Sequence, residues 1–68
     1  MGTIGEDLPK EMARVRDEVL PVYLSVGAPG AFAATMMRLE LDRASKAMIE
    51  GDLAEMIRSH KQLKEYRL

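Results

Sequence analysis

The 68-residue chain contains no cysteine, no tryptophan and no asparagine. Without cysteine, neither a disulfide bond nor a thiolate-ligated metal can stabilise the fold. Domains of this size bury only about 60% of the surface of the unfolded chain. Aromatic side chains are also scarce, since the chain has one phenylalanine, Phe32, and two tyrosines. Six methionines are present in addition. We therefore expect stability to come from close packing of aliphatic side chains and from self-association.

Charge is missing from the centre of the chain. No charged residue occurs from Val19 to Met37, so all 21 charged residues (10 basic and 11 acidic) lie outside this stretch. Prolines and glycines within it exclude a single regular helix. The stretch predicts two apolar half-helices that meet at a turn over residues 25–30. That turn argues against a membrane span, because lipid-exposed irregular backbone leaves polar groups without partners.

The beginning of the sequence has neither the basic flank nor the apolar run of a signal peptide. We expect residues 1–6 to form a flexible tail, residues 7–68 to form one domain, and the location to be cytoplasmic. Apolar residues make up 47% of the chain and charged residues 31%. This balance is typical of a folded protein rather than a disordered or membrane-embedded one.

Apolar residues recur at alternating spacings of three and four, which predicts helices at about 8–26, 30–50 and 52–66. Pro21 should kink the first helix, and Gly51 followed by Asp52 should separate the second from the third. The predicted fold is all-α, an antiparallel arrangement of three helices completed by oligomerisation. The expected inward positions of the three helices are, in order, Leu8, Met12, Val15, Val19, Val22 and Val26; Ala34, Met37, Leu41, Ala44 and Met48; and Leu53, Met56, Ile57, His60 and Leu63.

The sequence contains no recognisable catalytic or metal-binding pattern. His60 is the single imidazole, and no serine stands in a nucleophile motif with it. A carboxylate-bridged metal centre needs Glu-x-x-His pairs, but Ile57 occupies the position three residues before the histidine. The sequence therefore predicts a non-enzymatic protein without cofactor or metal, in which His60 has a structural role.

The apolar surface between residues 19 and 37 exceeds what one further helix can cover. Surplus apolar surface of this kind usually marks a protein contact, and symmetric self-association is the simplest outcome. Another protein's helix is a second possible partner. Aromatic side chains concentrate interface energy, so Tyr23 and Phe32 are the expected anchors. The predicted interface consists of Leu20, Tyr23, Leu24, Phe32, Met36 and Leu39.

Two alternatives stay open. Basic residues of the last helix give a local charge of +3, four cations less Glu65, and could bind phosphates in a nucleic-acid regulator. The rest of the chain then carries −4, which argues against general polyanion affinity. The candidate phosphate contacts are Arg58, Lys61, Lys64 and Arg67. The second alternative is peripheral membrane association through the apolar turn at residues 19–37.

Residues 17–23 (DEVLPVY) and residues 30–36 (GAFAATM) resemble segments of small uncharacterised helical proteins of bacteriophages and prophages. The resemblance covers about half of the chain and includes no motif of known chemistry. It implies a bacterial cytoplasmic setting and an accessory role, and it carries no catalytic residues.

Overall fold

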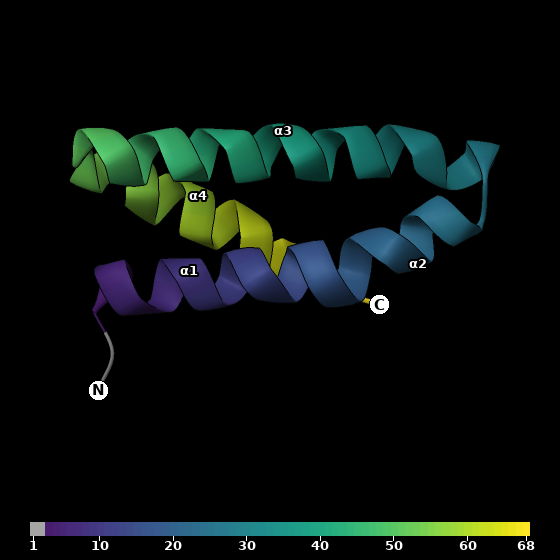
Figure 1. Cartoon of the computed structure of the whole chain (residues 1–68), viewed down its shortest axis with the longest axis horizontal. Helices are drawn as coiled ribbons and strands as arrows, with labels where there is room; N and C mark the ends of the chain where they lie inside the picture. The colour runs from purple at the N-terminus through teal and green to yellow at the C-terminus, as the bar shows by residue number, and fades with distance from the viewer. Residues whose placement is uncertain (1–2) are drawn as a thin grey trace.

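The computed structural model describes residues 3–68, and every regular element in that range is helical. The elements are α1 (Ile4–Arg14), the π-helical segment η1 (Val15–Val19), α2 (Leu20–Ser25), α3 (Ala28–Glu50) and α4 (Leu53–Glu65). In Figure 1, α1, η1 and α2 follow one another along one side, α3 returns antiparallel to them, and α4 runs back beside α1. The all-α prediction is confirmed.

The first helix begins earlier than predicted. It starts at Ile4, and the carbonyl of Thr3 accepts hydrogen bonds from the amides of Glu6 and Asp7. Acidic side chains in this first turn suit the positive end of the helix dipole. Ile4 packs against the core, which explains why the helix extends past the expected start. The tail predicted for residues 1–6 therefore does not include Ile4–Glu6, and Met1 and Gly2 lie outside the described residues.

The helix changes hydrogen-bonding pattern just before Pro21. Because proline has no amide proton, the carbonyl of Asp17 lacks its usual α-helical donor there. The preceding segment η1 widens into a π turn, and the Leu20 amide donates to the carbonyl of Val15, five residues earlier. A π turn holds about one more residue than an α turn.

This extra residue changes which side chains face inward. Up to Val19 the predicted inward positions are correct, since Leu8, Val15 and Val19 are buried. Beyond η1 the register has moved by one position, so Leu20 is buried and Val22 is exposed. The predicted inward positions at the end of the first helix are therefore wrong.

Helices α3 and α4 pack against each other with small side chains on their buried faces. The buried face of α3 includes the small residues Ala34, Ala44 and Ala47, as well as Met37. Small side chains allow neighbouring helices to approach closely, and Ser59 on α4 is fully buried. The buried side chains of α4 are Met56, Ser59 and Leu63.

The prediction placed Leu53 and Ile57 of α4 inside, and the structure shows both exposed. The buried face of α4 consists of Met56, Ser59 and Leu63, and at about 100° per residue Leu53 and Ile57 lie about 90° and about 130° around the helix from its centre. The turn that precedes α4 is as predicted. Gly51 has a left-handed backbone (φ 67°) and the carboxylate of Asp52 accepts the amide of Glu55.

The α2–α3 hairpin depends on a close backbone approach at Gly30. A Cβ atom added there would collide with the carbonyl oxygen of Tyr23 and come within 2.6 Å of a Val26 methyl group. Gly27, with φ 75°, supplies the left-handed residue at the turn itself. The absence of a side chain at residue 30 therefore sets the distance between α2 and α3.

Candidate protein-interaction surface

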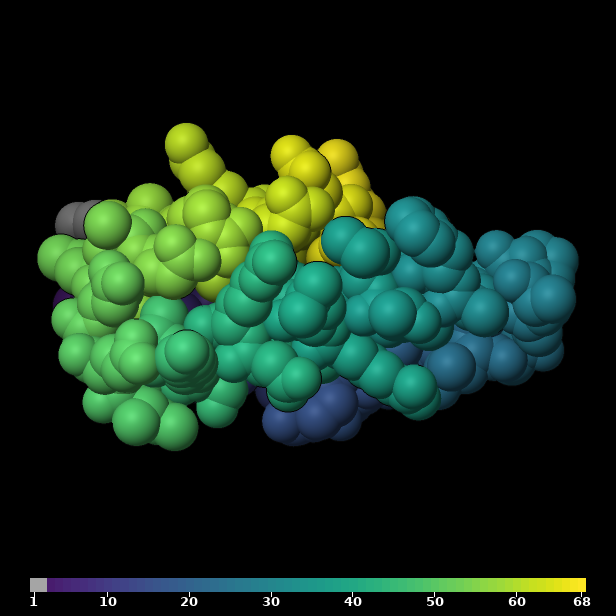
Figure 2. Space-filling view, turned by 90° about the horizontal axis from the view of Figure 1, so that it is seen from above, coloured from purple at the N-terminus to yellow at the C-terminus, as the bar shows by residue number. Residues whose placement is uncertain are grey.

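The hairpin formed by α2 and the first turns of α3 extends beyond the end of α4. Figures 1 and 2 both show this end of the molecule projecting past the C-terminal segment. α4 packs mainly on α1 and α3, whereas α2 packs on α3 and η1. We call residues 20–36 the hairpin tip. Its outer surface is left uncovered by α4, as the sequence had suggested.

Four of the six predicted interface residues are exposed. They are Leu24, Phe32, Met36 and Leu39, and Phe32 has the largest exposed fraction of them, 77%. The surface position predicted for Leu20 is wrong, whereas Tyr23 remains partly exposed. Leu20 is buried in the core, and Tyr23 is partly buried and packs against it. The cause is the π turn, which rotates both side chains inward.

Three of the exposed side chains form a single line along α3. Phe32, Met36 and Leu39 are spaced by four and three residues and therefore share one helix face. Gly30, which touches α2, lies about 200° around the helix from Phe32 at about 100° per residue. This outer stripe, as we name the three residues, consequently points away from α2.

A second apolar feature lies on α2. Val22, Tyr23 and Val26 of the hairpin tip, together with Leu68 at the end of the chain, line an open hollow of ≈ 270 Å³. We refer to it as the tip hollow. The sequence analysis missed it for two reasons: the π turn directs both valines outward, and the return of Leu68 to α2 is a tertiary contact without a local signal.

Exposed apolar side chains also occur at the opposite end of the bundle. Ile49 near the end of α3 is 84% exposed, and Leu53 and Ile57 on α4 are exposed as well. Sequence reasoning had assigned the last two to the core. Apolar exposure is therefore not confined to the hairpin tip, and Ile49 provides a matched comparison for Phe32 on the same helix.

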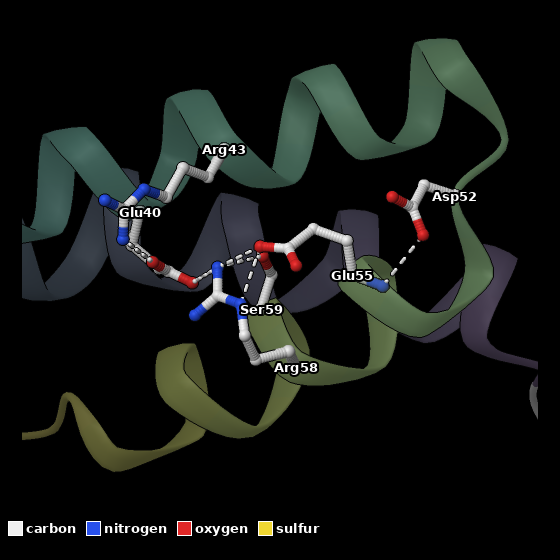
Figure 3. A network of polar contacts seen from close by, with 6 residues as sticks. All are labelled: Glu40, Arg43, Asp52, Glu55, Arg58 and Ser59. Atoms are coloured by element: carbon white, nitrogen blue, oxygen red, sulfur yellow. Dashed lines mark hydrogen bonds and ion pairs between the residues drawn. The ribbon is translucent and has the colours of Figure 1, made fainter.

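The polar centre of the molecule lies between α3 and α4, as Figure 3 shows. Glu40 is only 4% exposed, and its Oε1 atom lies 2.9 Å from Nη2 of Arg58. This contact is an ion pair whose angles fall outside hydrogen-bond geometry, so Oε1 has no well-directed donor. Arg43 contributes a longer ion pair of 3.9 Å to the other carboxylate oxygen.

Arg58 also binds its own helix. It donates to Glu55 across 2.6 Å and to the hydroxyl of Ser59 across 3.3 Å. The hydrogen bond to Glu55, followed by the charge of Glu40, raises the pKa of the Arg58 guanidinium, with burial acting in the opposite direction. These contacts tie α4 to α3 in one register. Nothing in the local sequence indicates that Glu40 is buried, because it lies among other charged residues of α3.

The four candidate phosphate-binding residues are not equally available. Arg58 is engaged by carboxylates, whereas Lys61 and Lys64 are exposed. Arg67 lies beyond the end of α4 at Glu65. Around the helix, positions 58 and 64 are separated by about 120°. The geometry brings together two lysines rather than four cations.

Residues 3–68 offer little support for a metal site or a membrane span. In this range no group of three His, Asp or Glu side chains is close enough to hold a metal ion. No helix in the described part of the chain has the length and hydropathy needed to cross a bilayer. His60 is partly buried on α4, in agreement with the position predicted for it.

The chain matches no protein-family model, no curated protein and no solved structure, so its function has to be argued from the surfaces described above.

Proposed function

We propose that this protein is a non-enzymatic helical interaction module that associates with further copies of itself through the hairpin tip and the outer stripe. The observation that carries the proposal is the 77% exposure of Phe32 in line with Met36 and Leu39, on a hairpin that α4 leaves uncovered. An aromatic anchor flanked by aliphatic and methionine side chains is the usual composition of an interface centre.

The small size of the exposed apolar surface determines how strong the self-association should be. The whole molecule exposes 4565 Å², and a standard protein interface takes about 800 Å² from each partner. The outer stripe consists of three side chains, far fewer than the roughly 20–30 residues that a standard interface takes from each partner. We therefore expect a weak, concentration-dependent contact rather than a permanent one. The kink expected at Pro21 belongs to the same proposal, because it would direct the tip away from the bundle.

The test is sedimentation equilibrium over a wide range of protein concentrations. The average mass of the unmodified protein should rise with concentration. Phe32→Ser should remain monomeric where the unmodified protein associates, because it removes the aromatic anchor. Ile49→Ser serves as the matched control, since it removes an equally exposed apolar side chain from the far end of α3.

The two variants separate the possible interfaces. If Ile49→Ser abolishes association and Phe32→Ser does not, the contact lies at the end of the bundle near Gly51 and the proposal is wrong. A monomer at every concentration of the unmodified protein would also contradict it.

A further inference from the structure

Each copy carries an exposed aromatic side chain on one face of the hairpin and an apolar hollow on another. Phe32 is the single aromatic residue of α3 and is highly exposed, and Met36 and Leu39 lie on the same face of the helix. The tip hollow is lined by apolar side chains of α2 and by Leu68. Both features are apolar, and within residues 3–68 no other segment covers either of them.

The hollow has room for the ring. An apolar cavity of about 150 Å³ is enough to hold a benzene molecule, and the tip hollow measures ≈ 270 Å³. Its lining is wide open to solvent on one side, so a side chain from outside can enter without a rearrangement of α2. An aromatic ring placed there would also lie beside Tyr23, and aromatic pairs attract one another beyond simple burial.

Phe32 cannot fill the hollow of its own chain. Gly30 rests against the Tyr23 carbonyl, and Phe32 lies about 200° further around α3 at about 100° per residue. Its ring consequently points away from α2 and from the hollow. A Phe32 ring that fills the hollow would therefore come from another copy of the chain.

We infer that the Phe32 side chain of one copy inserts into the tip hollow of the next, so that the protein associates head to tail. This inference rests on the proposed function and specifies the mode of contact. Because the inserting side chain and the receiving hollow are on different faces, each copy uses one on one neighbour and the other on a second neighbour. Such heterologous contacts generate open chains unless the rotation closes a ring.

The small number of side chains involved sets the expected strength of the contact. A contact made by one ring and its immediate neighbours belongs with the smallest specific interfaces, those below about 1,200 Å² in total. The association should therefore be weak and should extend gradually with concentration instead of stopping at two copies.

The experiment uses two variants that damage opposite halves of the contact. Phe32→Ser removes the inserting ring but keeps the hollow. Val22→Glu places a charge in the hollow but keeps the ring. Alone, each variant should associate at least about tenfold more weakly than the unmodified protein, the loss expected when burial of one large apolar side chain is removed. Mixed in equal amounts, the two should form one intact contact, giving a 1:1 dimer that grows no further.

Leu68→Glu provides a second hollow variant. Leu68 lies outside α4 and is exposed, so this change does not disturb the helices. It should behave as Val22→Glu does, alone and in the mixture with Phe32→Ser. Sedimentation velocity on each variant and each mixture measures the species directly, and circular dichroism checks that each variant is helical.

The outcomes distinguish the inference from the proposed function. If the unmodified protein associates but both hollow variants associate equally well, the hollow is not used and the head-to-tail contact is wrong. Mixtures that stay monomeric, or an unmodified protein that stops at a dimer, would likewise overturn it while leaving self-association intact. An unmodified protein that is monomeric throughout would overturn both.

Discussion

Replacing Gly30 by alanine should destabilise the protein, although alanine is the better helix former. The added Cβ atom would meet the backbone oxygen of Tyr23, which cannot rotate away, and a Val26 methyl group at 2.6 Å. Overpacking of this kind costs about 1–3 kcal/mol, and contact with backbone places it near the upper end. Alanine regains about 0.5–1 kcal/mol of helix propensity. The net loss should be about 2 kcal/mol.

A loss of about 2 kcal/mol is a large part of the total free energy of unfolding expected for this chain. A chain of this length has a free energy of unfolding of about 3–10 kcal/mol, from about 0.05–0.15 kcal/mol per residue. For a domain this small, 1 kcal/mol shifts the melting temperature by about 4–8 °C. Gly30→Ala should therefore melt about 8–16 °C below the unmodified protein. Thermal and urea unfolding followed by circular dichroism would measure both quantities.

Gly5 provides the matched control. It also lies in a helix, but a Cβ atom there would have only the Thr3 hydroxyl oxygen at 3.7 Å, which is an ordinary contact. Gly5→Ala should stabilise the protein by about 0.4–1 kcal/mol, mainly because the unfolded chain loses freedom. The two substitutions are thus expected to act in opposite directions. If Gly30→Ala were as stable as Gly5→Ala, the close approach of α2 and α3 would not be a feature of the folded protein.

Two further predictions concern charged groups. Arg58→Ala should lower the free energy of unfolding by about 1–2 kcal/mol in urea denaturation, because it leaves the buried carboxylate of Glu40 without its nearest cation. Lys61→Ala, on the exposed side of α4, is the control and should stay within about 0.5 kcal/mol of the unmodified protein. Equal effects of the two substitutions would show that the ion pair does not stabilise the fold. The hydrogen bond from Arg16 lowers the pKa of Asp17 below its ordinary value of 3.8, so the pair stabilises the fold above that value and the effect is lost as the pH falls through the folded-state pKa. Carboxyl titration by NMR should show this lowered pKa and its return toward 3.8 in Arg16→Ala, whereas an identical titration in both proteins would contradict the pairing.

The general architecture could be predicted from sequence because it depends on local signals. The apolar spacing of Leu8, Val15 and Val19 determined the inward face of the first helix. Gly51 and Asp52 marked the last turn because each has a clear conformational role. These signals act within a few residues, so one sequence is sufficient to interpret them.

The candidate surface was predicted less well, and the cause is the same at several positions. A spacing of three and four assumes an unbroken α-helix, but η1 inserts a wider turn before Pro21. Every side chain after it is therefore rotated, which exchanges Leu20 with Val22 between surface and core. Phe32 lies beyond the hairpin turn, on a helix with its own register, and its exposure was predicted correctly.

Tertiary contacts explain the burial and exposure that the sequence did not predict. Glu40 is buried because α4 crosses it with Arg58, and no neighbouring residue indicates this in the sequence. Leu53 and Ile57 are exposed because α4 packs on its neighbours through the face of Met56, Ser59 and Leu63. This face is accepted because the neighbouring helix α3 has small buried side chains, and the apolar spacing along α4 does not contain that information.

The π turn has a consequence for how the length of this chain could change over generations. Loss of a single codon between Val15 and Val19 would remove the extra residue of the π turn, and α-helical spacing of about 100° per residue would then bring Leu20 and Tyr23 to inward positions. Val22 and Val26 would stay on the outer side of α2. The chain before α2 can therefore gain or lose one residue by opening or closing a π turn, and the apolar surface of the hairpin is preserved through that length change.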